Sequence, residues 1–179
     1  MQKHNSIFQR HTLWCGVIGS ILLFTGCVSY RPVTTYDLLP VPVSNDYPAH
    51  WQLVVSNLTA VTGKMQFRKE QQQLLIDDYN RWVQAPDQML RRYLQLKLAS
   101  VPGSGKIRIA ILAWDCDLST REARLALELQ LDGKETEVLV ESAPLADGAA
   151  ANAGNFAQAM GIAAETMAER IAGHLREVR

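Results

Sequence analysis

The amino-acid sequence predicts an α+β fold, a two-layer sandwich in which a sheet of about five strands is covered by two amphipathic helices. Three observations lead to this prediction. The expected elements follow one another in the order strands, helix, three strands, helix. The expected strands have an apolar face that needs cover. Each helix carries one apolar stripe that can supply this cover.

The part of the chain before the first helix contains short strand signals. A strand is expected within Thr34–Leu39, in a proline-rich stretch, and a second at Trp51–Leu58. One or two more strands are expected within Met65–Ile76. These runs are short and apolar, as buried strands are.

The first helix is expected to open at Pro86 and to run to Ser100. Proline suits the first turn of a helix, and Asp87 places an acid near the positive end of the helix dipole. The apolar side chains recur every four residues along one face, at Leu90, Leu94 and Leu98. Pro102 and Gly103 end the helix.

Three strands are expected next. Lys106–Asp117 begins with alternating apolar residues that point one way, namely Ile107, Ile109, Ile111 and Ala113, and its middle is apolar on both sides, as in a central strand. Ala123–Leu131 alternates between apolar and polar residues, and Asp132-Gly133 is a strong hairpin signal. Glu135–Glu141 returns beside it, with Val138 and Val140 expected to point inward.

A loop of small residues at Ala143–Gly154 leads to a long closing helix over Asn155–Glu177. Its apolar residues recur at spacings of three and four and form one stripe, made up of Phe156, Met160, Ala163, Met167, Ile171 and Leu175. This helix is the second of the two expected to cover the sheet.

The charge balance excludes one class of partner. The 179 residues contain 18 basic and 18 acidic side chains, so the formal net charge is zero. A nucleic-acid-binding domain needs a basic surface to neutralise phosphates. We therefore expect no nucleic acid as a partner.

The N-terminus has the pattern of a secretion signal. Lys3 and Arg10 are basic, and the apolar run Leu13–Phe24 follows them. That run is too short to span a bilayer, which needs about 20 residues, but it suits the apolar region of a signal peptide. Leu23-Phe24-Thr25-Gly26-Cys27 then resembles the lipobox of bacterial lipoproteins.

The lipobox resemblance implies that residues 1–26 are removed and that Cys27 becomes the first residue, carrying a diacylglycerol and a fatty acid. Residues 27–49 then form a short tether, and residues 50–179 form the domain. Val28 stands where an Asp would favour retention in the inner membrane, so the outer membrane, on its periplasmic face, is the expected location. Tyr36 comes only nine residues after Cys27, which limits the distance of the folded part from the membrane to about 30 Å.

The candidate chemistry-bearing residues do not form a recognisable catalytic or metal-binding pattern. Cys116 is the one cysteine left after processing and sits in an apolar run, where it packs as a small hydrophobe. His50 and His174 lack ligand spacing. Asp115 and Asp117 share a side of a strand end, which indicates a solvated strand end, because a cation would need more oxygen ligands.

Two patterns that could carry chemistry are incomplete in this sequence. Pro102–Lys106 lacks the first glycine and the final serine or threonine of a phosphate-binding loop. A Cys116–His174 nucleophile pair has no supporting sequence context. We therefore expect a protein that is not an enzyme and has no metal ion or cofactor.

One stretch carries a family resemblance. Asp78-Tyr79-Asn80-Arg81-Trp82-Val83-Gln84-Ala85-Pro86 leads from a strand into an amphipathic helix. This arrangement resembles the ABC-type transport auxiliary lipoprotein family, which includes the lipoprotein of the paraquat-inducible intermembrane transport system. The lipobox, the segment Tyr36-Asp37-Leu38-Leu39-Pro40 and the closing helix rich in Ala and Met look similar too.

The resemblance implies an accessory subunit of an intermembrane lipid transport system, important for membrane integrity. Its expected partners are a periplasm-spanning protein of the mammalian-cell-entry type and inner-membrane transporter subunits. The resemblance also implies a ring of identical subunits. Arg81 and Trp82 are the candidate partner-binding residues. The other interpretation of this pair is structural, with Trp82 filling the core and Arg81 pairing with Asp77 or Asp78. The alternative function is activation of a cell-wall synthase by an outer-membrane lipoprotein.

Overall fold

The computed structural model describes residues 31–38, 50–59, 62–70, 73–146 and 151–177. The expected signal peptide at 1–26, the expected lipidation site Cys27 and most of the expected tether lie outside these residues. A compact unit extends from Val33 to Arg179. The first strand of the sheet therefore lies in a segment that the sequence assigns to the tether.

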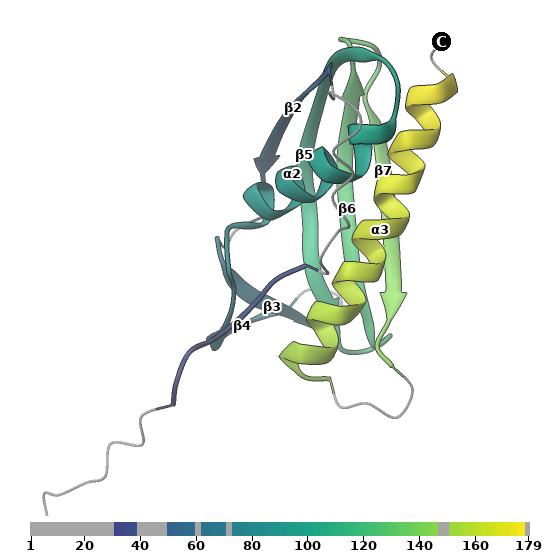
Figure 1. Ribbon diagram of the computed structural model, residues 1–179. Helices are drawn as coiled ribbons and strands as arrows, with labels where there is room; N and C mark the ends of the chain where they lie inside the picture. Colours follow the sequence, from purple (N-terminus) through teal and green to yellow (C-terminus); the bar gives the residue numbers. More distant parts are fainter. Residues whose placement is uncertain (1–30, 39–49, 60–61, 71–72, 147–150, 178–179) are drawn as a thin grey trace, which may run out of the picture. The chain divides into compact units, whose positions relative to one another are not determined.

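The elements form a seven-stranded mixed sheet and two main helices, which confirms the α+β class (Figure 1). The sheet is larger than the five strands expected, because the region before the first helix supplies four of them. In chain order the elements are β1 (Thr34–Tyr36), β2 (His50–Asn57), β3 (Lys64–Lys69), β4 (Gln73–Trp82), α2 (Pro86–Lys97), the 3-10 turn η2 (Leu98–Ser100), β5 (Ser104–Asp117), β6 (Glu122–Leu131), β7 (Glu137–Pro144) and α3 (Ala153–Glu177).

The strand order is β1-β4-β3-β5-β6-β7, with β2 also beside β5. Strands β5, β6 and β7 form an antiparallel meander. On the other edge of β5, β2 pairs in parallel with Ser104–Ile111, whereas β3 pairs with only Cys116 and Asp117. The β3–β4 hairpin is thus joined to the sheet by a short pairing at one end of β5.

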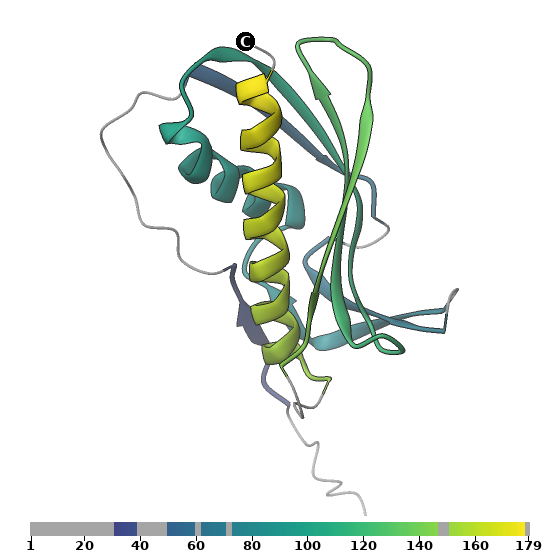
Figure 2. The same ribbon diagram turned by 90° about the vertical axis from the view of Figure 1, so that its right-hand side faces the viewer.

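Both helices lie on the same side of the sheet (Figure 2). Helix α3 packs over β6 and β7, and α2 packs over β2. Tyr93 and Lys97 of α2 both contact Glu165 of α3, and the Tyr93 hydroxyl donates to Glu165 Oε2 at 3.3 Å. Burial, followed by the nearby carboxylate, raises the pKa of Tyr93 above its usual range.

The core lies between the helices and the inner face of the sheet. On β6 it takes every second residue, as the sequence alternation predicts: Ala123, Leu125, Leu127 and Leu129 are all buried. The predicted stripe of α3 is also buried, from Phe156 to Leu175.

The predicted orientation of β7 is wrong. Val138 and Val140 are 58% and 51% exposed, and Leu139 between them is fully buried. The reason is the register of the hairpin, which places Leu139 directly opposite Leu127. Side chains of directly paired residues lie on the same face, so Leu139 points into the core and both valines point away from it. Three consecutive apolar residues leave this choice open in the sequence.

A bulge in β5 changes the second half of that strand. The register with β6 shifts between Ile111 and Ala113. An extra residue in one strand reverses the alternation beyond it. Consequently Trp114 and Cys116 belong to the core cluster and Ala113 lies on the outer face, opposite Ala126, contrary to the expectation that Ala113 follows Ile111.

Candidate functional site

The residues Arg81 and Trp82 end β4, and the structure places their side chains differently. Trp82 is 3% exposed. Its ring centroid lies 5.6 Å from that of Trp114 on β5 and 5.3 Å from that of Phe156 on α3, both in edge-to-face geometry. Phe67 on β3 extends the cluster, with its centroid 5.5 Å from that of Phe156. These four rings connect β3, β4, β5 and α3.

Arg81 is exposed and has neither of the expected carboxylate partners. Asp78 accepts from Lys64 Nζ at 2.5 Å. Asp77 accepts from the backbone N–H groups of Tyr79 and Asn80 at 2.8 and 3.0 Å. Partner binding by Arg81 and Trp82 remains a prediction, and of the two side chains only that of Arg81 is presented at the surface.

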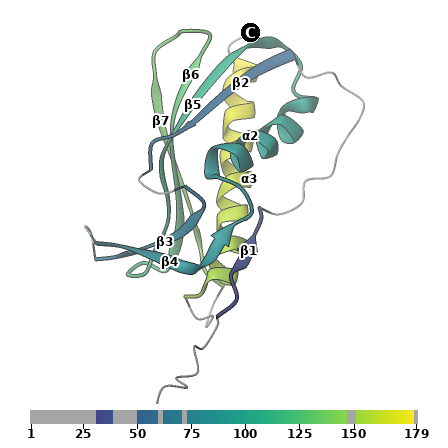
Figure 3. The ribbon, with the colours of Figure 1, turned by 90° about the vertical axis from the view of Figure 1, so that its left-hand side faces the viewer.

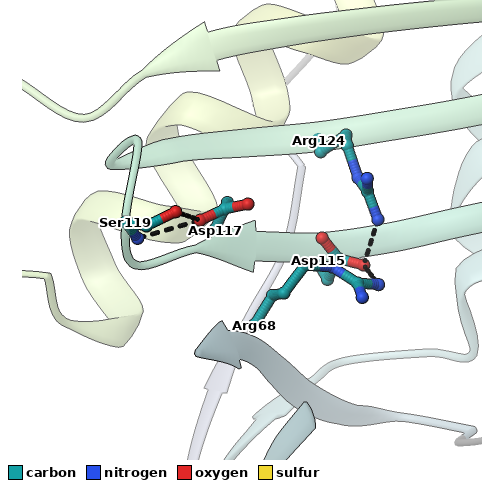
Figure 4. A network of polar contacts seen from close by, with 5 residues as sticks. All are labelled: Arg68, Asp115, Asp117, Ser119 and Arg124. Carbon is teal, nitrogen blue, oxygen red and sulfur yellow. Dashed lines mark hydrogen bonds and ion pairs between the residues drawn. The ribbon is translucent and has the colours of Figure 1, made fainter. Parts of the chain in front are cut away.

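A network of charged side chains lies on the outer face of the sheet, where β3, β5 and β6 meet (Figure 4). Asp115 is 2% exposed, so it is not the solvated residue expected from the sequence. Its Oδ2 accepts from Arg68 Nη2 at 2.8 Å and from Arg124 Nη2 at 3.1 Å. The hydrogen bond to Asp115 raises the pKa of Arg68, so this guanidinium stays charged.

Asp117 lies on the same face as Asp115, as its spacing predicts, but its carboxylate accepts hydrogen bonds from the turn after β5. Its Oδ1 accepts from the backbone N–H of Ser119 at 2.8 Å and from the Ser119 hydroxyl at 2.5 Å (Figure 4). The hydrogen bond from the Ser119 hydroxyl is the main cause that lowers the pKa of Asp117. Within the described residues, no group of three His, Cys, Asp or Glu side chains is arranged to hold a metal ion.

Cys116 and His174 lie apart in the fold. Cys116 is fully buried and pairs with Ala123 at the start of β6. His174 Nε2 lies 3.6 Å from Glu137 Oε2, and Glu137 pairs with Leu129 near the other end of β6. Six residues of a strand span about 20 Å. The two side chains therefore cannot act as a nucleophile and its base.

We predict that Cys116 reacts slowly in the folded protein. Burial, assisted by Asp115 and Asp117, raises the pKa of the Cys116 thiol from 9.0 to about 11. At pH 8 this lowers the thiolate population about 100-fold, and the thiolate is the reactive form. Iodoacetamide should therefore modify the Cys116 peptide rapidly in guanidinium and at most very slowly in native buffer. Equal rates in the two conditions, read by mass spectrometry, would contradict the burial.

The outer face of the sheet is not covered by any described helix (Figure 2). Its apolar residues include Val54, Leu112, Val138 and Val140, which are 41–58% exposed. Beside them a shallow hollow of about 260 Å³ is lined by Val54, Ser56, Arg108, Ala110, Glu128, Gln130 and other residues. We call this surface the open sheet face. Sequence reasoning missed most of it, because it placed Val138 and Val140 in the core.

The β3–β4 hairpin carries a second apolar surface that the sequence did not identify as a site. Leu74, Leu75, Ile76 and Tyr79 are 39–48% exposed. A hollow of about 490 Å³ lies between this hairpin and the start of α3, lined in part by Phe67, Leu75, Ile76 and Leu118. The available signal was the run of three apolar residues after Gln73, which cannot all face a core from one strand.

Comparison with known proteins identifies the fold alone. No protein-family model and no curated protein matches this sequence. The crystal structure of an uncharacterized protein is similar over 83% of this chain and 99% of its own, with a TM-score of 0.61 and 14% identity. The crystal structure of protein XCC0632 from Xanthomonas campestris, assigned to family DUF330, is similar over 84% of this chain and 99% of its own, with a TM-score of 0.58 and 16% identity.

Among the described residues, neither helix has the length and apolar character needed to cross a membrane.

Proposed function

We propose that the protein is an outer-membrane lipoprotein that acts as an accessory subunit of an intermembrane lipid transport system and docks a periplasm-spanning protein of the mammalian-cell-entry type. The proposal rests on the sequence between the lipobox and the domain. Cys27 follows a signal-like apolar run, and Thr34 of β1 comes only seven residues later. An acylated Cys27 would hold the domain within about 25 Å of its lipid leaflet.

The open sheet face supports a binding role for the domain. Exposed apolar residues grouped on one surface are typical of sites that bind another protein or a membrane. Val138 and Val140 are more than half exposed and lie on adjacent outward positions of the edge strand β7. A membrane-held domain with such a face suits an accessory subunit that receives a larger partner.

The competing function is activation of a cell-wall synthase. Such an activator must reach across the peptidoglycan from the outer membrane, and this usually requires a long linker. Thr34 comes only seven residues after Cys27, which gives the anchor little reach. This observation favours the transport role over the synthase role.

The test is co-purification from membranes. The full-length protein, tagged at its C-terminus, is extracted in mild detergent, and its companions are identified by mass spectrometry. We expect a mammalian-cell-entry type protein and inner-membrane transporter subunits. Cys27→Ala should remove both the acyl chains and the outer-membrane location. The Val138→Lys variant should co-purify with much less of the partner, because the substitution places a charge in the proposed contact.

Ile162→Lys is the matched control, since Ile162 is 48% exposed on α3. This variant should retain the partner. Capture of a cell-wall synthase in place of transport proteins would favour the competing function. An unmodified Cys27 thiol in the wild-type protein would contradict the anchor.

A further inference from the structure

The apolar residues of the β3–β4 hairpin lie on both of its faces. We call Leu74, Leu75, Ile76 and Tyr79 the hairpin patch. Leu74 and Ile76 pair with Arg68 and Gln66, whereas Leu75 pairs with Phe67, so successive leucines point to opposite faces. A hairpin that packs one face on a core and exposes the other to water alternates apolar and polar residues. Strand β4 of this hairpin instead exposes apolar side chains on both faces, Leu75 beside Phe67 on one face, and Leu74 and Ile76 beside Arg68 and Gln66 on the other.

The hairpin lies at the same end of the domain as the first strand. β1 pairs in parallel with Asn80–Trp82 at the end of β4. In Figure 3 β1 and the β3–β4 hairpin both lie at the lower end, and the C-terminus lies at the upper end. Leu74 precedes Asn80 by six residues, which is about 20 Å along a strand. The chain from Cys27 to Thr34 spans at most about 25 Å. The reach of the anchor is therefore similar to the distance between β1 and the hairpin patch.

Most charges around the hairpin patch have a neighbour of opposite charge, whereas the carboxylate of Asp77 is stabilised by hydrogen bonds. The carboxylate of Asp78 is paired with Lys64, and that of Asp77 accepts hydrogen bonds from the backbone of Tyr79 and Asn80. Lys69 at the end of β3 and Glu70 directly after it carry opposite formal charges. The contact is therefore apolar in character, and it should depend little on salt.

We infer that the hairpin patch inserts into the interfacial layer of the same lipid leaflet that holds the acyl chains of Cys27. This inference rests on the proposed function for its anchor. The acyl chains fix one point of the domain, and the hairpin patch fixes a second. Two contacts restrict the rotation of the domain about its tether. The open sheet face then has a defined orientation relative to the membrane.

The test uses single fluorescent probes on the full-length lipidated protein in vesicles of phosphatidylethanolamine and phosphatidylglycerol. Cys15 leaves with the signal, Cys27 is acylated and Cys116 is buried, so an introduced cysteine is the accessible thiol. Ile76→Cys and Leu75→Cys place the probe on opposite faces of the hairpin. Lys134→Cys, exposed in the turn between β6 and β7, is the matched control at the far end of the sheet.

With quencher-labelled lipids, both hairpin probes should lose most of their fluorescence and the Lys134→Cys probe should keep it. The result should be unchanged in high salt. Vesicle-bound protein with equal quenching at all three positions would overturn the inference and leave the anchor intact. A hairpin probe that is shielded without lipid, in proportion to protein concentration, would assign the patch to a second copy and also overturn it. Protein that does not associate with vesicles at all would instead contradict the proposed anchor.

Discussion

Replacing Trp82 by alanine is expected to lower the free energy of unfolding by about 3–5 kcal/mol. The indole is 3% exposed and contacts the rings of Trp114 and Phe156. Its removal leaves a cavity where β4, β5 and α3 meet, and both the burial and the ring contacts are lost. Since a domain of this size is stable by about 5–15 kcal/mol, the loss is a large part of the total.

Urea denaturation of the full chain checks this result, and two variants serve as controls. Arg81→Ala changes the exposed neighbour and should alter the stability by no more than about 0.5 kcal/mol. Trp82→Phe keeps a ring in the cluster and removes the indole N–H, which has no hydrogen-bond partner among the described residues. It should cost much less than Trp82→Ala. Equal midpoints for Trp82→Ala and Arg81→Ala would show that the indole is not a core residue.

The expected role of the Arg81-Trp82 motif can be refined in the same terms. The sequence shows an aromatic residue before a proline-initiated helix, a pattern that a docking loop and a core contact produce equally well. Only the spatial positions of Trp114 and Phe156, which are 32 and 74 residues further along the chain, distinguish the two. Trp82 packs in the core at the end of β4, and Arg81 is exposed, so partner contact by Arg81 remains a prediction.

Two of the elements after the first helix, β6 and α3, could be predicted because their periodicity is unambiguous. The alternation of Ala123–Leu131 and the apolar stripe of the closing helix each allow one burial pattern, and the structure has it. The burial predictions fail where the sequence pattern is compatible with two different burial patterns. Val138, Leu139 and Val140 are all apolar, so the register of the hairpin decides which of them is buried.

Long-range contacts account for the remaining differences. The bulge between Ile111 and Ala113 has no sequence signal, because an extra residue in an apolar run leaves that run apolar. The burial of Asp115 also depends on partners that lie 47 residues before it and 9 residues after it. The sequence alone predicts that a carboxylate near the end of a strand is exposed to solvent, because it does not show which residues pair with that carboxylate.

Asp115→Ala is expected to cost about 3 kcal/mol, because it leaves two guanidinium groups beside each other without their shared carboxylate. The side chains of Arg68 and Arg124 are 18% and 37% exposed, so solvent screens part of their repulsion and the cost lies at the low end of the usual range. Asp78→Ala removes an exposed partner of Lys64 and should cost no more than about 1 kcal/mol. Urea denaturation compares the two variants directly.

The Asp115 variant should also loosen one part of the molecule before the rest. β3 pairs with β5 through only two residues, and the Arg68–Asp115 ion pair reinforces that connection. Hydrogen exchange in Asp115→Ala should therefore accelerate in Lys64–Trp82 and much less in β6 and β7. Uniform acceleration would show that the ion pair stabilises the whole sheet.

Replacing Arg68, Asp115 and Arg124 together by apolar residues should restore the stability, because no charge is then left without a partner. The Asp115→Ala variant should also weaken the quenching of the hairpin probes, because the Arg68–Asp115 ion pair helps the short β3–β5 pairing to hold the hairpin in position. The triple variant should not weaken it.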